Sequence, residues 1–326
     1  MYSLEAEAEW LRSCQVPPPH PGAGALCMTP ARGRCVPYFA NLALTAALAV
    51  PGMLPATAAY LNWYLAHTRP DGSMDDWFFD ARRTWTHGRR DSVDSYAATF
   101  LTLAQRYSAM AGPAWAQAHL PALRRIAGAI ERLRSGNGLT WARRTWPVQF
   151  TMDNSEVHRG LSDWSDLLAA LGEPAGTARA QAERTRQAVL ALLWDARRQA
   201  FYYARLPLGA HAGPNWTRWV EAAVQQSPLL SGVIPPDDLR ARVLYLRLCL
   251  AFPAWELGET GDPFPWLILG RAAAALGDRA RVQRLLAYAE AHFMGGESGY
   301  WYCGEAGHYL QLRLWLEGQA HAPLLA

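Results

Sequence analysis

The chain has 326 residues, a formal net charge of +3, and 51% apolar against 18% charged residues. This composition predicts an ordered protein of one large or two ordinary domains. All 31 basic residues are arginine. The absence of lysine excludes a lysine Schiff base, a pyridoxal anchor and a Walker-type phosphate lysine, and we expect no cofactor.

The same numbers restrict the expected partners and location. The arginines are interspersed with acidic residues, so nucleic acid is not an expected partner. The five cysteines form no C-x-x-C pair, and the histidines lack the paired spacing of zinc ligands, so we expect no metal site. The N-terminus lacks the basic start of a secretory signal, and the apolar run "NLALTAALAV" ends at Pro51, short of a membrane span. We therefore expect a soluble, cytoplasmic protein.

Helical periodicity dominates the chain from end to end. Apolar residues recur at three- and four-residue spacing, and no set of long strands is evident. Residues such as Pro55 and Pro113 mark helix starts, and Gly112 and Gly172 mark helix ends. In chain order, the predicted helices cover residues 3–14, 38–50, 55–67, 92–110, 115–134, 154–171, 177–194, 215–226, 236–252, 263–276, 279–293 and 305–318.

Short and long loops alternate between these helices. Tight links such as "VPGMLP", "LGEPAG" and "LGD" predict helical hairpins, and long loops such as "RPDGSMDDWFFDARRTWTHGRR" connect one hairpin to the next. If alternate helices form an inner ring, the long loops and the inner N-termini gather on one rim. Every second helix does open with acids, aromatics, amides or histidine, in "CVPYFAN", "RRDSVDSYA", "TMDNSEVHRGL", "GPNWTRWVE", "GETGDPFPW" and "YCGEAGHYL". This sorting by parity favours a functional rim.

From Val36 to Trp315, these features resemble the six-hairpin glycosidase-like proteins. The opening "DSVDSYAATFLTLA" is similar to the acid-bearing inner helix of bacterial endoglucanase-type toroids. The opening "DNSEVHRGLSDWSDLLAALG" is similar to the Asp-containing inner helix of unsaturated glucuronyl hydrolases. The resemblance implies an all-α (α/α)6 toroid, with 1–326 as a single domain and 1–36 as an N-terminal segment that braces the outside. It also implies a carbohydrate-active enzyme, although this fold hosts sugar epimerases, lyases and terpene cyclases too. The chain has no D-x-D-D run, which disfavours a cyclase.

Glycoside hydrolysis requires two carboxyl groups, one protonated and one ionised. We predict that Asp153 or Glu156 is an acid–base residue and that Asp94 faces it across the rim. Acids three residues apart share a helix face and raise one another's pKa. The competing interpretation is structural, because Asp153 and Glu156 match a capping box and Asp91 precedes a helix as an N-cap. By analogy with toroid enzymes, we expect an inverting mechanism.

Other rim residues are candidates for binding an oligo- or polysaccharide in a tryptophan-lined cleft, since tryptophan combines a broad apolar face with a polar N–H. The predicted set is Tyr38, Asn41, Asp91, Trp141, Trp146, Gln149, His158, Trp216, Trp219, Glu259, Trp301, Glu305 and His308. Arginine pairs on the long loops, such as Arg89 with Arg90, extend the expected substrates to uronic acids. Two alternatives stay open. One is a sugar epimerase that uses rim histidines such as His158 and His308, and the other is a non-catalytic carbohydrate-binding toroid.

Overall fold

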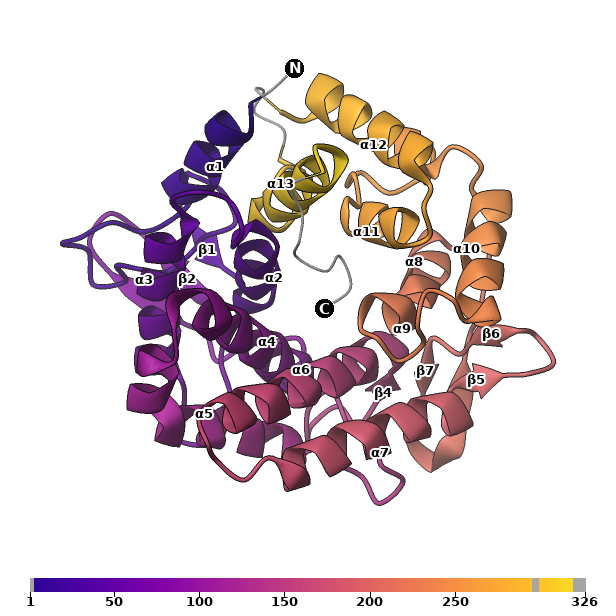
Figure 1. The fold of residues 1–326 in the computed structure, drawn as a ribbon, viewed down its shortest axis with the longest axis horizontal. Helices are drawn as coiled ribbons and strands as arrows, with labels where there is room; N and C mark the ends of the chain where they lie inside the picture. Colours follow the sequence, from indigo (N-terminus) through magenta and orange to yellow (C-terminus); the bar gives the residue numbers. More distant parts are fainter. Residues whose placement is uncertain (1–2, 295–298, 319–326) are drawn as a thin grey trace.

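In the computed structural model, which describes residues 3–294 and 299–318, the helices form two concentric rings around a common centre (Figure 1). The inner ring consists of α2 (Pro37–Ala47), α4 (Val93–Ala111), α6 (Thr151–Ala170), the short α8 (Trp219–Ala223) and α9 (Ser227–Leu230), α11 (Ile268–Ala275) and α13 (Cys303–Leu316). The outer ring consists of α1 (Leu4–Ser13), α3 (Met53–His67), α5 (Ala114–Glu131), α7 (Gly176–Leu192), α10 (Leu239–Ala251) and α12 (Arg279–His292). This architecture confirms the predicted all-α class. Residues 1–2, 295–298 and 319–326 of the predicted domain lie outside the described residues.

Three departures of the helix boundaries from the prediction concern the part of the ring described below. The predicted helix 215–226 is broken into α8, the 3₁₀ turn Val224–Gln226 and α9, because Pro228 at the start of α9 cannot continue the hydrogen-bond ladder. The predicted helix 263–276 begins only at Ile268, since Trp266 has the left-handed φ of 54°. The helix predicted from residue 154 begins at Thr151. This third difference changes the interpretation of the acidic cluster described below.

The long loops fold into small sheets with strands of two or three residues. In one sheet, β2 (Trp77–Phe79) lies between β1 (Arg34–Cys35) and β3 (Thr84–Thr86). A second sheet has the order β4 (Gln149–Phe150), β7 (Ala204–Arg205) and β8 (His211–Ala212), and the third pairs β5 (Trp194–Asp195) with β6 (Ala200–Phe201). All these pairs are antiparallel. Because β1 and β4 directly precede inner helices, the sheets fix where those helices begin.

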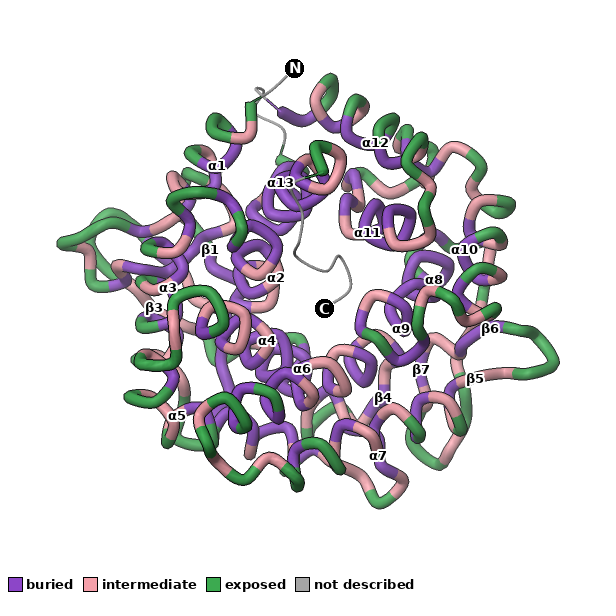
Figure 2. Tube along the Cα trace, viewed as in Figure 1, coloured by how far each residue is buried: buried purple, intermediate pink, exposed green. Residues whose placement is uncertain are grey.

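The inner helices are the most deeply buried elements, and the outer helices expose their outward faces (Figure 2). Two inner contacts are close enough to require glycine. A Cβ at Gly160 of α6 would lie 2.5 Å from the carbonyl oxygen of Ala98 in α4, and a Cβ at Gly307 of α13 would lie 2.5 Å from the Cα of Ala43 in α2. Backbone-to-backbone packing therefore sets the spacing of α4 from α6 and of α2 from α13.

The helix α1 occupies the outer position beside α13, within the predicted bracing segment 1–36 (Figure 1). The Trp301 Nε1–H donates to the buried Glu7 carboxylate at 3.0 Å, and the Trp10 and Trp301 rings make an edge contact. Burial raises the pKa of Glu7 to about 7. The first and last described helices are therefore joined by a side-chain seam.

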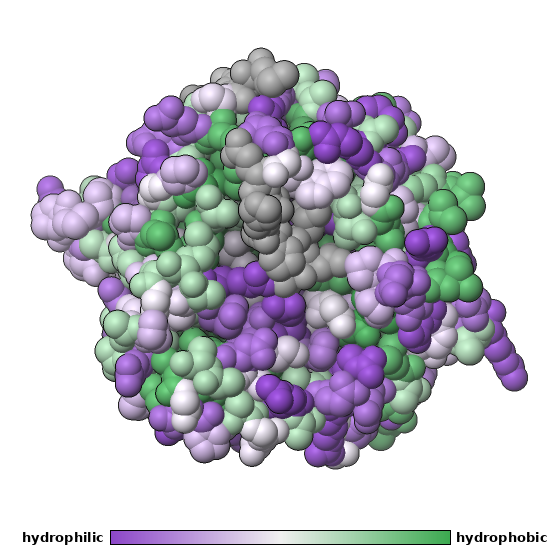
Figure 3. All heavy atoms as spheres, viewed as in Figure 1, coloured by the Kyte–Doolittle hydropathy of each residue, from purple (hydrophilic) through white to green (hydrophobic). Residues whose placement is uncertain are grey.

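The outer helix α10 has an apolar stripe on its solvent side. Leu239, Leu246 and Leu250 are 73%, 60% and 79% exposed and share one helix face. Figure 3 shows hydrophobic side chains at this edge of the ring. None of the described helices combines the length and apolarity needed to cross a membrane.

Candidate active site

A cavity of about 990 Å³ lies where the inner helices begin. Its lining includes residues from the first turns of α2, α4, α6, α11 and α13, from α9, and from the loops that precede these helices. The lining residues used below are Arg34, Tyr38, Phe39, Asp76, Arg89, Arg90, Asp91, Ser92, Tyr96, Arg143, Asp153, Asp262, Phe264, Trp266, Tyr302, Glu305 and His308. The polar openings of alternate helices thus meet at one place. Helix N-termini also direct free N–H groups and positive dipole ends toward it.

Asp153 lines this cavity from the first turn of α6, and its carboxylate does not cap its own helix. The N-cap position is Phe150, and Asp153 Oδ2 accepts instead from the Ser92 hydroxyl at 2.8 Å. The capping-box interpretation is therefore wrong. Burial, together with the nearby carboxylates of Asp94 and Glu156, raises the pKa of Asp153 well above its usual range.

Asp94 lies behind Ser92 and is fully buried. Its Oδ1 accepts hydrogen bonds from the Ser92 hydroxyl and, at 2.9 Å, from the Ser95 N–H. Its Oδ2 accepts one from the Thr140 hydroxyl at 2.6 Å. Asp94 is predicted to face Asp153 or Glu156 across the rim; it lies instead beside Asp153, and the Ser92 hydroxyl connects the two carboxyls. Asp91 lines the cavity, but the N-cap of α4 is Ser92, so Asp91 does not have its predicted capping role.

Glu156 lies one turn further along α6, in a separate pocket of about 70 Å³. Its Oε1 accepts from the Tyr38 hydroxyl at 2.6 Å, and its buried Oε2 has no hydrogen-bond partner among the described residues. Burial raises the pKa of Glu156 to about 8, which keeps this carboxyl neutral near pH 7. Tyr38 contributes to the walls of both spaces, whereas Glu156 is not among the lining residues of the larger cavity.

Glu305 enters the cavity from α13, which lies across the ring from α6 (Figure 1). Its Oε2 accepts the Leu267 N–H at 2.8 Å, and Tyr302 also bonds to the carboxylate. Burial raises the pKa of Glu305 to about 7. His308 follows one turn later; burial and the nearby Arg271 hold the pKa of His308 well below its usual value, so the imidazole is neutral.

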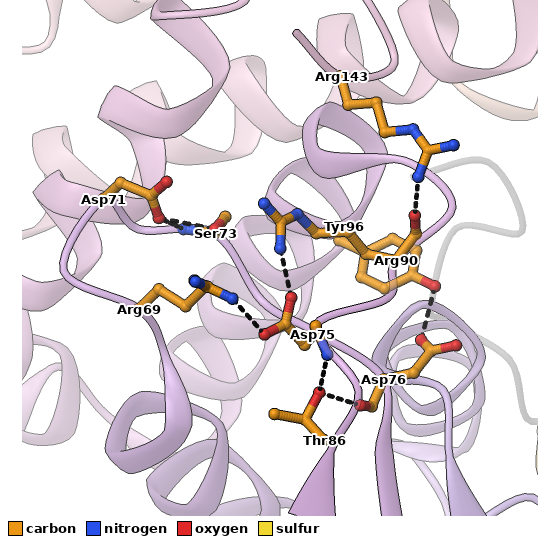
Figure 4. A network of polar contacts seen from close by, with 10 residues as sticks. Arg69, Asp71, Ser73, Asp75, Asp76, Thr86, Arg90, Tyr96 and Arg143 are labelled. Carbon is orange, nitrogen blue, oxygen red and sulfur yellow. Dashed lines mark hydrogen bonds and ion pairs between the residues drawn. The ribbon is translucent and has the colours of Figure 1, made fainter. Parts of the chain in front are cut away.

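A network of ion pairs supports one wall of the cavity (Figure 4). Asp75 accepts from Arg69 at 2.7 Å and from Arg90. Asp76 accepts from Arg34 at 2.6 Å and from the Tyr96 hydroxyl at 2.9 Å. The network fixes the loop before α4, since both aspartates come from that loop and are buried.

The same wall contains arginines that no carboxylate pairs with in the described residues. Arg34, Arg89, Arg90 and Arg143 all line the cavity. Arg34 and Arg90 pair with the aspartates of the network, whereas Arg143 donates to the Arg90 carbonyl oxygen at 2.9 Å. Arg89 is exposed and forms no ion pair within residues 3–294 and 299–318. This wall can bind an anionic group.

The aromatic lining differs from the predicted tryptophan-lined cleft. Trp266 is the tryptophan among the described lining residues, and its Nε1–H donates to Asp262 at 2.8 Å. The remaining aromatic side chains are tyrosines and phenylalanines, namely Tyr38, Phe39, Tyr96, Phe264 and Tyr302. Trp266 lines the cavity and has a left-handed backbone conformation, and strained conformations of this kind are common at functional sites.

The predicted tryptophans lie elsewhere. Trp301 bonds to Glu7 in the seam, and Trp219 is buried against Phe252 and Trp266. Trp216 packs under the Arg247 guanidinium, and Trp146 contacts Phe150 on the outer loop. Trp141 is half-buried on the loop after α5. None of these five tryptophans is among the residues that line the cavity, because a long loop supports packing on its outer side as well as on its inner side.

Four polar candidates also lie away from the cavity. Asn41 is fully buried and bonds to Thr99 and Tyr60 between helices. Gln149 bonds to Asn137 and Arg205, and Glu259 is exposed on the loop before α11. His158 faces α7, where its Nδ1 lies 3.0 Å from the Ala182 carbonyl oxygen, and this contact contradicts its predicted role in the site.

Four residues of the cavity lining were not expected from the sequence, namely Arg34, Asp76, Ser92 and Trp266. The acidic run "SMDDWFF" contains Asp76 and is a signal that could have been used, whereas Ser92 has no distinguishing pattern. Within the described part of the chain, no three His, Cys, Asp or Glu side chains are placed to hold a metal ion. The titratable side chains on the described lining of the cavity are carboxyls, guanidiniums, tyrosine phenols and the imidazole of His308.

No family model and no curated protein sequence matches the chain. Solved structures with a similar fold do exist, at low sequence identity. One is described as "Glycosidase E178A", with a TM-score of 0.71 and 14% identity over 99% of this chain and 96% of that one. Another is a GH63 mannosylglycerate hydrolase from Thermus thermophilus, with a TM-score of 0.67 and 14% identity over 95% of this chain and 99% of that one. An uncharacterized conserved protein from the same organism has a TM-score of 0.65 and 14% identity over 95% and 99% of the two chains. The chain therefore shares the fold of solved glycosidases along nearly its whole length.

Proposed function

We propose that this protein is a glycoside hydrolase in which Asp153 is the general acid and Glu305 the general base. The observation that carries the proposal is the pair of buried carboxyls with raised pKa on α6 and α13, helices that face each other across the ring and both line the cavity. Glycoside hydrolysis requires two carboxyls on either side of the scissile bond. The two-ring arrangement also supports an (α/α)6 toroid formed as a single domain.

The surroundings of the two carboxyls support different roles. Burial, and after it the neighbouring carboxyl of Asp94, raise the pKa of Asp153, which favours a protonated carboxyl that can donate to the leaving oxygen. Glu305 accepts hydrogen bonds from a backbone N–H and from Tyr302, which favour its ionised form above pH 7. A carboxylate there removes a proton from the attacking water.

We propose that the reaction inverts the anomeric configuration. The acid and the base come from opposite sides of a cavity of about 990 Å³, which leaves room for a water molecule between Glu305 and the sugar. Inverting enzymes separate their carboxyls by roughly 6.5–9.5 Å for this reason. Proton NMR of the first product formed, before mutarotation, tests this stereochemistry directly.

The cationic wall supports a substrate that carries a carboxylate. Arg89 and Arg143 supply guanidinium groups beyond those held by Asp75 and Asp76. One structure of similar fold is a mannosylglycerate hydrolase, and glycerate is such a carboxylate. We therefore propose a short acidic glycoside as the substrate.

The test is a hydrolysis assay with aryl glycosides and with glycosides of glycerate and of uronic acids. Asp153→Asn and Glu305→Gln should each lower kcat by about 100-fold or more while the circular dichroism spectrum is unchanged. Glu183→Gln on the outer helix α7 is the matched control and should retain full activity. Wild-type rates in both cavity variants would refute the acid and base assignments.

The same variants distinguish the two alternative functions. A carbohydrate-binding protein without catalytic activity would bind its ligand equally well with or without the two carboxyls. An epimerase would require two proton-transfer groups; His158 points away from the cavity, which leaves His308 as the histidine on the described lining. Full loss of epimerisation in His308→Gln, with Asp153→Asn active, would favour that function.

A further inference from the structure

The hydroxyl of Ser92 lies between two carboxyl groups. It is bonded to Asp94 Oδ1 on one side and to Asp153 Oδ2, at 2.8 Å, on the other. Ser92 and Asp153 belong to the cavity lining, whereas Asp94 is buried behind them. A single side chain therefore connects the proposed acid to a carboxyl that does not reach substrate.

The two hydrogen bonds of the Ser92 hydroxyl require one of the two carboxyls to be protonated. A serine hydroxyl has one hydrogen, and an ionised carboxylate can only accept. If both aspartates were ionised, Ser92 could satisfy one of them and would present a lone pair to the other. Two hydrogen bonds at one hydroxyl therefore require that one of the two carboxyls is protonated and donates to Ser92 Oγ.

The other contacts identify which carboxyl is protonated. Burial raises the pKa of both aspartates, but Asp94 accepts from the Ser95 N–H and the Thr140 hydroxyl in addition to Ser92, and these donors on both of its oxygens lower its pKa and favour its ionised form. Ser92 is the hydrogen-bond donor that the described chain supplies to Asp153. The proton therefore resides on Asp153, and the charge resides on Asp94.

We propose that Ser92 is a hydrogen switch between Asp94 and Asp153, and that Asp94 is a positioning residue that keeps the acid protonated. This inference rests on the proposed role of Asp153. In the resting site, Ser92 donates to Asp94, and Asp153 donates to Ser92. When substrate binds, a half-turn of the Asp153 carboxyl about its Cβ–Cγ bond directs the proton into the cavity.

During the reaction, the glycosidic C–O bond breaks, and its electron pair stays on the leaving oxygen, which takes the Asp153 proton. Water forms the new bond to the anomeric carbon and loses a proton to Glu305. The Ser92 hydrogen then turns from Asp94 to the new Asp153 carboxylate and stabilises it. Asp153 regains a proton from solvent as Glu305 loses one, so the cycle is balanced.

The other carboxyls around Asp153 act in the same direction as Asp94, whereas a guanidinium acts in the opposite direction. The other carboxyls are those of Asp91, on the loop before α4, and of Glu156, on α6. The nearby phenol is that of Tyr203. The Arg90 and Arg143 guanidiniums line the cavity, but Arg90 is held by Asp75. Asp94 is the carboxyl bonded to the same hydroxyl as Asp153, so its removal should have the largest effect on Asp153.

The test is a ¹³C NMR titration of proteins with labelled aspartate side-chain carboxyls, with Asp153→Asn used to assign the Asp153 signal. In wild type, this carboxyl should remain protonated at pH 6. In Asp94→Asn, its titration midpoint should fall by at least one pH unit, and the basic limb of the kcat/KM profile should move with it. In Ser92→Ala, the midpoint should not fall, whereas kcat should fall about 10-fold or more and KM should change little. Ser92→Thr, which keeps the hydroxyl, should restore kcat.

Asp195→Asn in β5 is the control and should leave the Asp153 signal unchanged. The assignment of the proton to Asp153 is overturned if the Asp153 carboxyl is ionised at pH 6, or if Asp94→Asn does not move its titration midpoint. Full kcat in Ser92→Ala overturns the switch. The titration requires no turnover, so failure of the proposed function would appear separately, as wild-type activity in Asp153→Asn and Glu305→Gln.

Discussion

Glu156 allows a quantitative test of the electrostatics beneath the cavity. Glu156→Gln keeps the side-chain volume and keeps an oxygen to accept the Tyr38 hydroxyl, but it removes the titration. The carboxyl of Glu156 has one partnered oxygen and one buried oxygen without a partner among the described residues. Its ionised form is therefore poorly solvated in the folded protein and well solvated in the unfolded chain.

The sign and size of the effect follow from the pKa of Glu156. Its ordinary value is 4.5, and the folded value is about 8. Between these values, the folded state holds a proton that the unfolded state has lost, so the wild-type free energy of unfolding declines as pH rises, by about 1.4 kcal/mol per pH unit. Over the whole window this gives about 5 kcal/mol, present below pH 4.5 and lost by pH 8. Acids with raised pKa that do not interact with Glu156, such as Glu7, contribute equally to both proteins and cancel.

The assay is urea denaturation of wild type and Glu156→Gln at pH values from about 5 to 9. The stability of the variant relative to wild type should rise steadily with pH up to about 8 and then level off. The control Glu183→Gln replaces a glutamate whose pKa is lowered by Arg186, so it should show no such trend above pH 5. A stability difference between Glu156→Gln and wild type that does not change with pH would refute the reasoning.

Three further predictions concern packing, substrate binding and the pH dependence of activity. Gly160→Ala should destabilise the fold by about 3 kcal/mol, because the added Cβ would lie against the backbone of Ala98. A Cβ added at Gly176 would have no neighbour within 4 Å, so Gly176→Ala should leave the midpoint of thermal unfolding unchanged. Arg89→Ala should raise KM for an acidic glycoside by about 10-fold and leave KM for a neutral analogue unchanged; equal effects on both substrates would contradict the anionic wall. In wild type, kcat/KM should fall below pH 7 as Glu305 takes up a proton, and an acid limb far below that pH would exclude Glu305 as the base.

The sequence predicted the helices well because their periodicity is local. It also predicted that alternate helix openings would converge, and these openings contain Asp153, Glu305 and His308. The positions of the carboxyls relative to one another could not be predicted, since they depend on where each helix begins. With α6 beginning at Thr151, Asp153 is in the third helical position and bonds to a serine of another helix opening.

The errors among the aromatic residues have a different physical origin. Loop tryptophans can pack against the outer helices or face the cavity, and the sequence pattern is the same in both cases. Trp266 directly follows Pro265, where the helical pattern is interrupted, and its left-handed backbone is visible only in the structure. Likewise, Arg34 and Asp76 form an ion pair across 42 residues through pairing of β1 with β2.

The seam between α1 and α13 gives the ring a preferred point of mechanical failure. The first described helices, α1 and α2, meet the last, α13, only through space, by contacts such as that of Glu7 with Trp301 and the close approach of Gly307 to Ala43. A force that pulls α1 away from α13 should therefore open the seam before it unfolds a hairpin. Because the pKa of Glu7 is about 7, raising the pH through this value places a charge in the buried seam, and the opening force should decrease. The force needed to separate α1 from α13 is thus expected to depend on pH.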